Sequence, residues 1–178
     1  MGFSIESGNG NGQQVGVKNN RLDVSAKTNG RATYVAREDG QCYFFTHSYN
    51  YGAGDTILWL TNTSTTKNLH IEKIHVAGDT ATLFTIHCPL YVAPSGSSIT
   101  GTNSNRTSGN SADAVCIGDE VNNSQANILI KDILIANSSK NFPVDGKIIL
   151  GYHDCLAVDF TTVGALAAVS FVGYYEDN

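Results

Sequence analysis

The chain has 178 residues, a net charge of -5 and a charged fraction of only 15%. This length fits one ordinary domain, or one domain with an arm. The 11 Lys and Arg residues form no basic stripe that could neutralise phosphates, and no run approaches the ~20 apolar residues of a membrane span. We therefore expect neither nucleic acid nor a membrane as a partner.

The composition favours strands over helices. With so few charges, the solvated surface must consist of Asn, Ser, Thr and Gly, and the chain contains 18 Gly. Val, Ile, Thr and Tyr are abundant, and these residues suit strands better than helices. We therefore predict an all-β protein.

The first 40 residues differ in composition from the rest and are predicted to form an extended N-terminal arm. Gly8 to Gly12 alternates glycine with asparagine, which makes a flexible stretch. Period-two alternation around Asn19-Asn20 then predicts a small hairpin. Its apolar residues are Val15, Val17, Leu22 and Val24. Because an isolated hairpin is only marginally stable in water, we expect the arm to pack against the main domain or a partner.

Residues 41–178 carry short alternating runs separated by turns, which is typical of an antiparallel sandwich. The runs cover 42–47, 56–62, 69–76, 80–88, 112–117, 126–136, 147–152, 156–160 and 165–175. These nine runs predict about eight strands, the number in which two Greek keys make a jelly roll. We predict an eight-stranded antiparallel jelly-roll sandwich.

Two of these runs depart from simple strand alternation. In 69–76 the apolar parity changes midway, and a β-bulge near Glu72-Lys73 would reconcile the two halves. The run 126–136 (ANILIKDILIA) is compatible with a helix, but we prefer a strand because Ile dominates it and Ala is sparse.

A loop of Ser, Gly, Asn and Thr at 95–111 is the candidate outer contact loop. Loops longer than ~12–15 residues without structure are uncommon and are usually functional or disordered. The candidate contact residues in it are Asn103, Asn105 and Arg106, and Arg106 is its one charge.

Grouped catalytic or metal-ligating side chains are not apparent. His87-Cys88 and His153-Asp154-Cys155 could meet in space as a zinc site, but the usual zinc spacings are absent. There is no phosphate-binding loop, nucleophile elbow or dinucleotide motif. We expect no enzyme activity, no metal and no cofactor.

The four cysteines are dispersed singly inside apolar stretches. They are Cys42, Cys88, Cys116 and Cys155. In a reducing compartment such cysteines behave as small buried hydrophobes, so we predict free thiols. In a secreted chain, three pairings would be open.

Four segments carry a resemblance to known proteins. They are KNNRLDVSA, GDTILWLTNTSTTKNLHIEKIHV, NSNRTSGNSADA and DGKIILGYHDCLAVDFTTVGALAAVSFVGYYED. Together they resemble structural proteins encoded in tailed-phage genomes, and their layout is similar to that of jelly-roll decoration or cement proteins. The resemblance implies a jelly-roll body, often a trimer, clamped on the outer capsid lattice. The partner would be the major capsid protein, and the chain would be made in the bacterial host cytoplasm and reside in the virion.

The arm fits such a role. We hypothesise that Ile5, Val15, Val17, Leu22 and Val24 contact the capsid or an adjacent subunit. Alternatively, the arm covers a sheet edge of its own domain.

Two other classes of function stay open. A trimeric receptor-binding or tail-fibre tip module would hold host glycans with the 95–111 loop and with exposed tyrosines. The tyrosines considered are Tyr43, Tyr49, Tyr51, Tyr174 and Tyr175. A small jelly-roll enzyme of the cupin type would need a clustered His and Glu metal set, which the sequence does not supply.

Overall fold

The computed structural model describes residues 17–18, 21–22, 31–52, 55–91, 95–120, 125–162 and 164–178. The chain divides into two compact units, residues 1–30 and 31–178. In the first unit, β1 (Val17–Lys18) and β2 (Arg21–Leu22) pair antiparallel, with Val17 opposite Leu22. This pairing agrees with the hairpin expected around Asn19-Asn20. Ile5, Val15 and Val24 lie outside the described residues.

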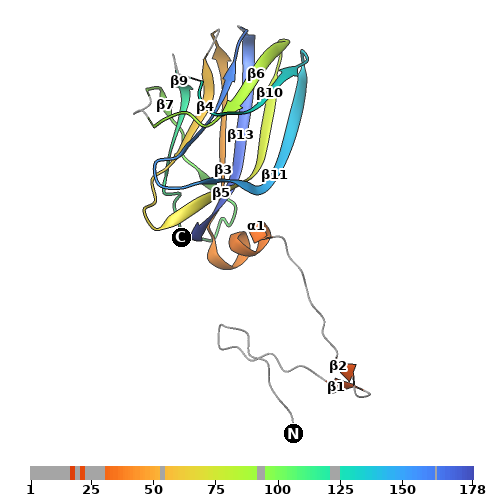
Figure 1. Cartoon of the computed structure of the whole chain (residues 1–178), viewed down its shortest axis with the longest axis vertical. Coiled ribbons are helices and arrows are strands. Elements are labelled where there is room, and N and C mark those ends of the chain that lie inside the picture. The colour runs from red at the N-terminus through yellow and green to blue at the C-terminus, as the bar shows by residue number, and fades with distance from the viewer. Residues whose placement is uncertain are drawn as a thin grey trace. The chain divides into compact units, whose positions relative to one another are not determined.

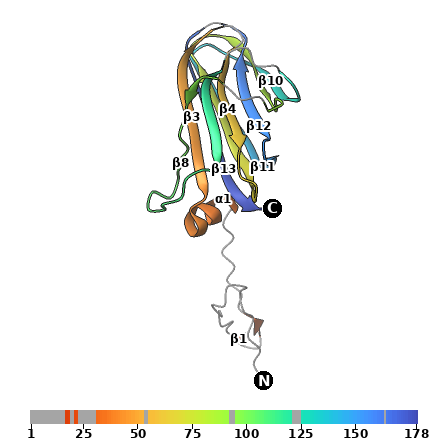
Figure 2. The same cartoon turned by 90° about the vertical axis from the view of Figure 1, so that its left-hand side faces the viewer.

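The second unit is a sandwich of two antiparallel sheets, which confirms the all-β prediction (Figure 1). Its strands are β3 (Cys42–Tyr51), β4 (Thr56–Asn62), β5 (Lys67–Gly78), β6 (Thr82–His87), β7 (Ser97–Ser98), β8 (Thr102–Asn103), β9 (Ala114–Glu120), β10 (Ile128–Leu134), β11 (Ser138–Leu150), β12 (Cys155–Phe160) and β13 (Gly164–Asp177). The six-stranded sheet has the order β10-β6-β12-β4-β9-β7, and the five-stranded sheet has the order β11-β5-β13-β3-β8. Figure 2 shows the sandwich after a quarter turn.

Two short helical turns precede β3. They are α1 (Arg31–Tyr34) and the π-helical turn η1 (Val35–Asp39). Gly40 ends η1 with a left-handed φ of 60°, which glycine adopts at little cost. Residues 31–40, which the sequence places with the arm, pack on the sandwich here, because Val35 is fully buried against Cys42 and Tyr174. No helix of the described residues is long and apolar enough to cross a membrane.

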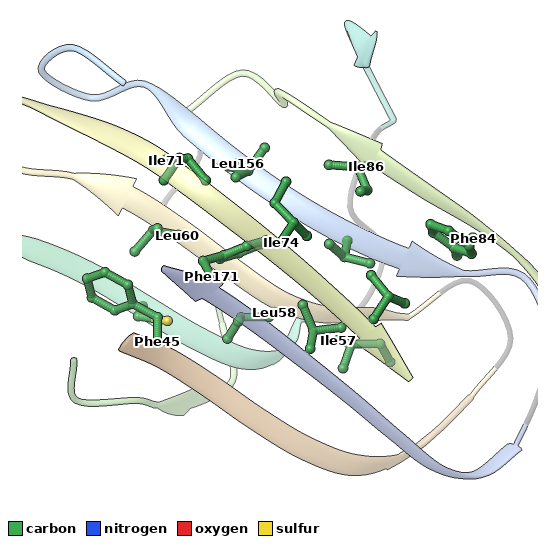
Figure 3. Close-up of a cluster of buried hydrophobic side chains, with 14 of the residues drawn as sticks. Phe45, Ile57, Leu58, Leu60, Ile71, Ile74, Phe84, Ile86, Leu156 and Phe171 are labelled. Carbon is green, nitrogen blue, oxygen red and sulfur yellow. The ribbon is translucent and has the colours of Figure 1, made fainter. Parts of the chain in front are cut away.

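The hydrophobic core lies between the two sheets (Figure 3). Period-two alternation places one side of each strand there, and the facing residues are aliphatic or aromatic. The core residues labelled in Figure 3 are Phe45, Ile57, Leu58, Leu60, Ile71, Ile74, Phe84, Ile86, Leu156 and Phe171. This layer helps to fix the register of strands with one exposed face, because a one-residue slip would turn their apolar set outward.

The predicted bulge in β5 is present. Lys73 pairs with Val172 and Ile71 pairs with Gly173, so Glu72 is the extra residue between them. The bulge lets both halves of the strand face the core. The buried residues on its two sides are Leu69, Ile71, Ile74 and Val76.

The strand count and some boundaries need correction. Residues 126–136 do contain a strand, β10, and not a helix. The sandwich has eleven strands in place of about eight, partly because the two-residue strands β7 and β8 lie inside the predicted 95–111 loop. The run 147–152 is only the end of β11, which begins at Ser138 and contains Pro143. The proline hid this strand in the sequence, but an edge strand tolerates it, and the register shifts between Pro143 and Ile148.

Candidate contact surfaces

The predicted contact loop is ordered by its own asparagines. Asn103 Nδ2 donates to the carbonyl oxygens of Gly40 at 2.7 Å and Asn110 at 3.1 Å. Asn103 Oδ1 in turn accepts from the backbone N–H of Asn105 at 2.9 Å. Both polar atoms of the Asn103 side chain therefore hold the loop in place against Gly40. Of the three predicted contact residues, Arg106 is exposed, whereas Asn103 and Asn105 are partly buried.

Asn105 continues the same pattern one turn further on. Its Oδ1 accepts from Thr107 N at 3.1 Å and from Thr107 Oγ1 at 2.7 Å. This is an Asx-type turn, in which the side chain replaces a backbone acceptor. We conclude that Asn103 and Asn105 shape the loop, and that Arg106 is the charge it presents to solvent.

The free edge at β10 exposes several large aliphatic side chains, with the exposed Lys131 among them. Four large aliphatic side chains are exposed there, and we call them the β10 edge surface: Ile128, Leu129, Ile133 and Ile135. Ile133 is 61% exposed and Ile135 is 70% exposed. Alternate residues turn inward, since Leu134 is fully buried. An exposed hydrophobic edge strand is a ready site for pairing with another chain, and natural proteins usually protect such edges with charges.

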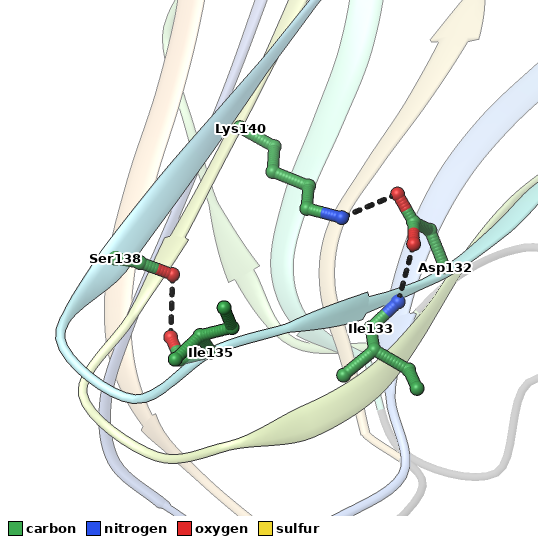
Figure 4. Close-up of polar contacts among 5 residues, drawn as sticks. All are labelled: Asp132, Ile133, Ile135, Ser138 and Lys140. Atoms are coloured by element: carbon green, nitrogen blue, oxygen red, sulfur yellow. Dashed lines mark hydrogen bonds and ion pairs between the residues drawn. The ribbon is translucent and has the colours of Figure 1, made fainter.

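A polar bridge holds the β10 edge to the neighbouring edge strand of the other sheet (Figure 4). Lys140 Nζ of β11 lies 2.5 Å from Asp132 Oδ2 of β10, and Ile133 N donates to Asp132 Oδ1 at 2.7 Å. These hydrogen bonds to the carboxylate lower the pKa of Asp132. At the turn between the strands, Ser138 Oγ donates to the carbonyl oxygen of Ile135. These polar contacts therefore hold in place the strand that carries the β10 edge surface.

Part of the outward face of the six-stranded sheet is also buried. Trp59, Ile117, Cys155 and Ala157 form a second apolar cluster on this side. Next to it, His87 and Asp159 are buried as a pair, with Nε2 and Oδ2 2.9 Å apart. Sequence reasoning missed this pair, because the two residues lie 72 positions apart and meet only through the pairing of β6 with β12.

The two histidine motifs that suggested a metal site come only partly together. Cys88, His153, Asp154 and Cys155 line one cavity. His87 points instead to Asp159. In the described part of the chain, no three His, Cys, Asp or Glu side chains are grouped closely enough to hold a metal ion.

The four thiols are free, and burial raises the pKa of each. Burial raises the pKa of Cys116 to about 12. Three of the thiols are buried and Cys88 is only partly so. Raised pKa values keep the thiols protonated near neutral pH and therefore poorly nucleophilic.

Comparison of the chain with known proteins identifies no relative. No protein-family model, no curated protein and no solved structure matches the chain. The case for the contact surfaces therefore comes from the geometry of this chain alone.

The tyrosines proposed for sugar stacking are mostly unsuited to it. Tyr43, Tyr174 and Tyr175 are buried, and Tyr43 OH donates to the carbonyl oxygen of Ser111. The half-exposed tyrosines that sequence reasoning missed are Tyr91 and Tyr152. Both stack on His153. Tyr152 is its neighbour in sequence, but no local pattern predicts the contact with Tyr91, because it depends on two distant turns.

Proposed function

We propose that this chain is a structural protein of a tailed-phage virion that binds the capsid exterior as a decoration or cement protein. Its body is a jelly roll, its partner is the major capsid protein, and it acts by adhesion rather than by catalysis. The observation that carries the proposal is the β10 edge surface, four exposed aliphatic side chains on and next to a braced edge strand.

Strand pairing supports the jelly-roll assignment. A jelly roll is a long antiparallel ribbon rolled on itself, so that the first of eight strands pairs with the eighth, the second with the seventh, the third with the sixth and the fourth with the fifth. With β3, β4, β5, β6, β10, β11, β12 and β13 as the eight, the observed pairs are β3–β13, β4–β12, β5–β11 and β6–β10. On this assignment β7, β8 and β9 are additions between the fourth and fifth strands.

The chemistry of the β10 edge surface favours a protein partner. Exposed aliphatic side chains near one another mark protein contact sites, and an edge strand adds backbone hydrogen-bonding groups to the same surface. A capsid presents its surface many times over, so modest affinity per copy is amplified when several copies act together. No deep pocket is required for this mode of binding.

The N-terminal unit supplies a second contact in this proposal. Ile5, Val15, Val17, Leu22 and Val24 contact the capsid or a neighbouring subunit, and the body assembles as a trimer. Sedimentation of the purified chain should then give three times its mass of 19.0 kDa. A monomer mass at micromolar concentration would contradict the trimer.

The direct test is binding of the full chain to empty phage heads that lack it. The double variant Ile133→Asp with Ile135→Asp places two charges on the β10 edge surface, and we expect at least about tenfold weaker binding. The matched control is Leu166→Asp on β13, an exposed aliphatic residue of the other sheet. Unchanged binding of the double variant, or equal loss in the control, would refute the proposed surface.

A further inference from the structure

A small cavity lies where β6 ends and where β11 turns into β12. Its volume is about 270 Å³, and its walls include Tyr91, Asn127, Leu150, His153 and Asp154. Ligand pockets usually begin near 300 Å³ and combine apolar or aromatic walls with a few polar groups. A cavity of this size suits a ligand of about one ring.

Two rings of an aromatic ladder, Tyr91 and His153, line this cavity, and the third ring, Tyr152, lies outside the lining. The rings of Tyr91 and His153 stack at 4.4 Å with an interplanar angle of 5°, and the ring of Tyr152 stacks on His153 at 3.8 Å. Tyr91 is 47% exposed and Tyr152 is 53% exposed. Because stacking fixes the three rings, Tyr91 presents a rigid, half-open apolar face beside the cavity.

Two polar side chains complete the lining. Asn127 Nδ2 donates to the carbonyl oxygen of Cys88 at 3.2 Å, and Asp154 Oδ2 accepts from Gly151 N at 2.9 Å. Each side chain is thus oriented through one atom, while Asn127 Oδ1 and Asp154 Oδ1 have no hydrogen-bond partner among the described residues. His153 and Asn127 hold left-handed φ angles of 66° and 51°, an uncommon conformation for residues other than glycine that is frequent at binding sites.

The charge of the lining selects the kind of ligand. Asp154 is its one charged residue, and no Lys or Arg is among the described residues that line it. An anion would meet a carboxylate with no compensating cation. A neutral polyol would instead place its hydroxyl groups on the amide and carboxylate oxygens and its apolar C–H face on the tyrosine ring.

We propose that this cavity binds one neutral pyranose ring, such as a hexose at the end of a glycan. Tyr91 stacks on the C–H face of the sugar, and Asn127 and Asp154 accept hydrogen bonds from its hydroxyls. Asn127 directly precedes Ile128, so the site borders the β10 edge surface, but sugar binding is measured without capsids and can fail while capsid binding holds.

The test is saturation-transfer NMR on the full chain with glucose, galactose, mannose, N-acetylglucosamine and the anionic sugar sialic acid. We expect transfer from aromatic protein protons to at least one neutral sugar, with a dissociation constant on the order of millimolar. Tyr91→Ala should weaken this binding about tenfold, whereas Tyr91→Phe, which keeps the ring, should stay within about twofold.

Two further variants separate binding from folding. Asn127→Gly removes the amide at a φ that glycine adopts freely, and it should also weaken binding. Phe44→Ala, at an exposed aromatic residue on β3 of the other sheet, should leave binding unchanged. The site is refuted if no neutral sugar shows transfer, if sialic acid binds best, or if Tyr91→Ala binds as the unaltered chain does.

Discussion

His87 Nε2 lies 2.9 Å from Asp159 Oδ2, and both side chains are completely buried on the outward face of the six-stranded sheet. Thr56 Oγ1 donates to the other carboxylate oxygen, Asp159 Oδ1, at 2.6 Å. Despite the short distance between them, no hydrogen bond joins His87 Nε2 to Asp159 Oδ2, and Thr85 Oγ1 has no hydrogen-bond partner among the described residues. Because a buried polar group without a partner is costly, this cluster should couple strongly to stability.

Asp159→Ala should lower the free energy of unfolding by about 3 kcal/mol, because it leaves His87 buried without its partner. His87→Ala should cost a similar amount. The double variant should cost clearly less than the two single changes added together, because neither group then remains unpaired. Urea denaturation of the four proteins measures this coupling, and additive costs would show that the two side chains do not interact.

Phe171→Ala should lower the free energy of unfolding by about 3–5 kcal/mol, since Phe171 is fully buried between the sheets and the change leaves a cavity. The control is Leu166→Ala on the same strand, where the side chain is half exposed and the cost should be below about 1 kcal/mol. Thermal or urea unfolding distinguishes the two. Similar costs at both positions would contradict the assignment of the core to the inner face of β13.

Thiol alkylation should begin at Cys88. It is the one partly exposed thiol, whereas Cys116 is buried with a pKa of about 12. At pH 8 we expect iodoacetamide to modify Cys88 first and to leave Cys116 unmodified in the folded chain, because the thiolate is the reactive form. Peptide mass spectrometry over time measures the order. Early modification of Cys116 would contradict its burial.

The Asp132–Lys140 bridge should make a small, pH-dependent contribution to stability. Hydrogen bonds from Lys140 and from Ile133 N hold the pKa of Asp132 below its ordinary value. The unfolded chain therefore takes up this proton at a higher pH than the folded one, so the contribution is present above about pH 4 and is lost as pH falls through the folded pKa.

The unfolding free energy of the unaltered chain should fall between pH 6 and pH 2. In Asp132→Asn this decrease should be smaller, because the carboxylate is absent. The control Asp145→Asn changes an exposed carboxylate 4.0 Å from Lys147, and it should alter the profile less. Parallel profiles for Asp132→Asn and the unaltered chain would contradict the bridge.

Local alternation predicts those parts of the fold whose burial is regular. The limits of β4 match the predicted run 56–62, because its seven residues are all buried and bounded by polar turns. The bulge at Glu72 follows from a change of parity that only an extra residue can explain. The first half of β11 escapes prediction because an edge strand with half-exposed residues and Pro143 lacks a strong apolar pattern.

The candidate sites are less visible in sequence than the strands. The isoleucines of β10 are easily seen, but the sequence cannot say that Ile133 and Ile135 face solvent until β10 is placed at an edge. The ladder of Tyr91, Tyr152 and His153 depends on two turns that are distant in the chain. Long-range pairing, rather than local propensity, creates both surfaces.

Electron microscopy of the intact phage particle tests the account most directly. Adhesion to a repeated capsid surface predicts two-layered β bodies of this size in hundreds of copies on the head, with the β10 edge turned toward the major capsid protein. A head without such density, or a few copies confined to the tail tip, would contradict it.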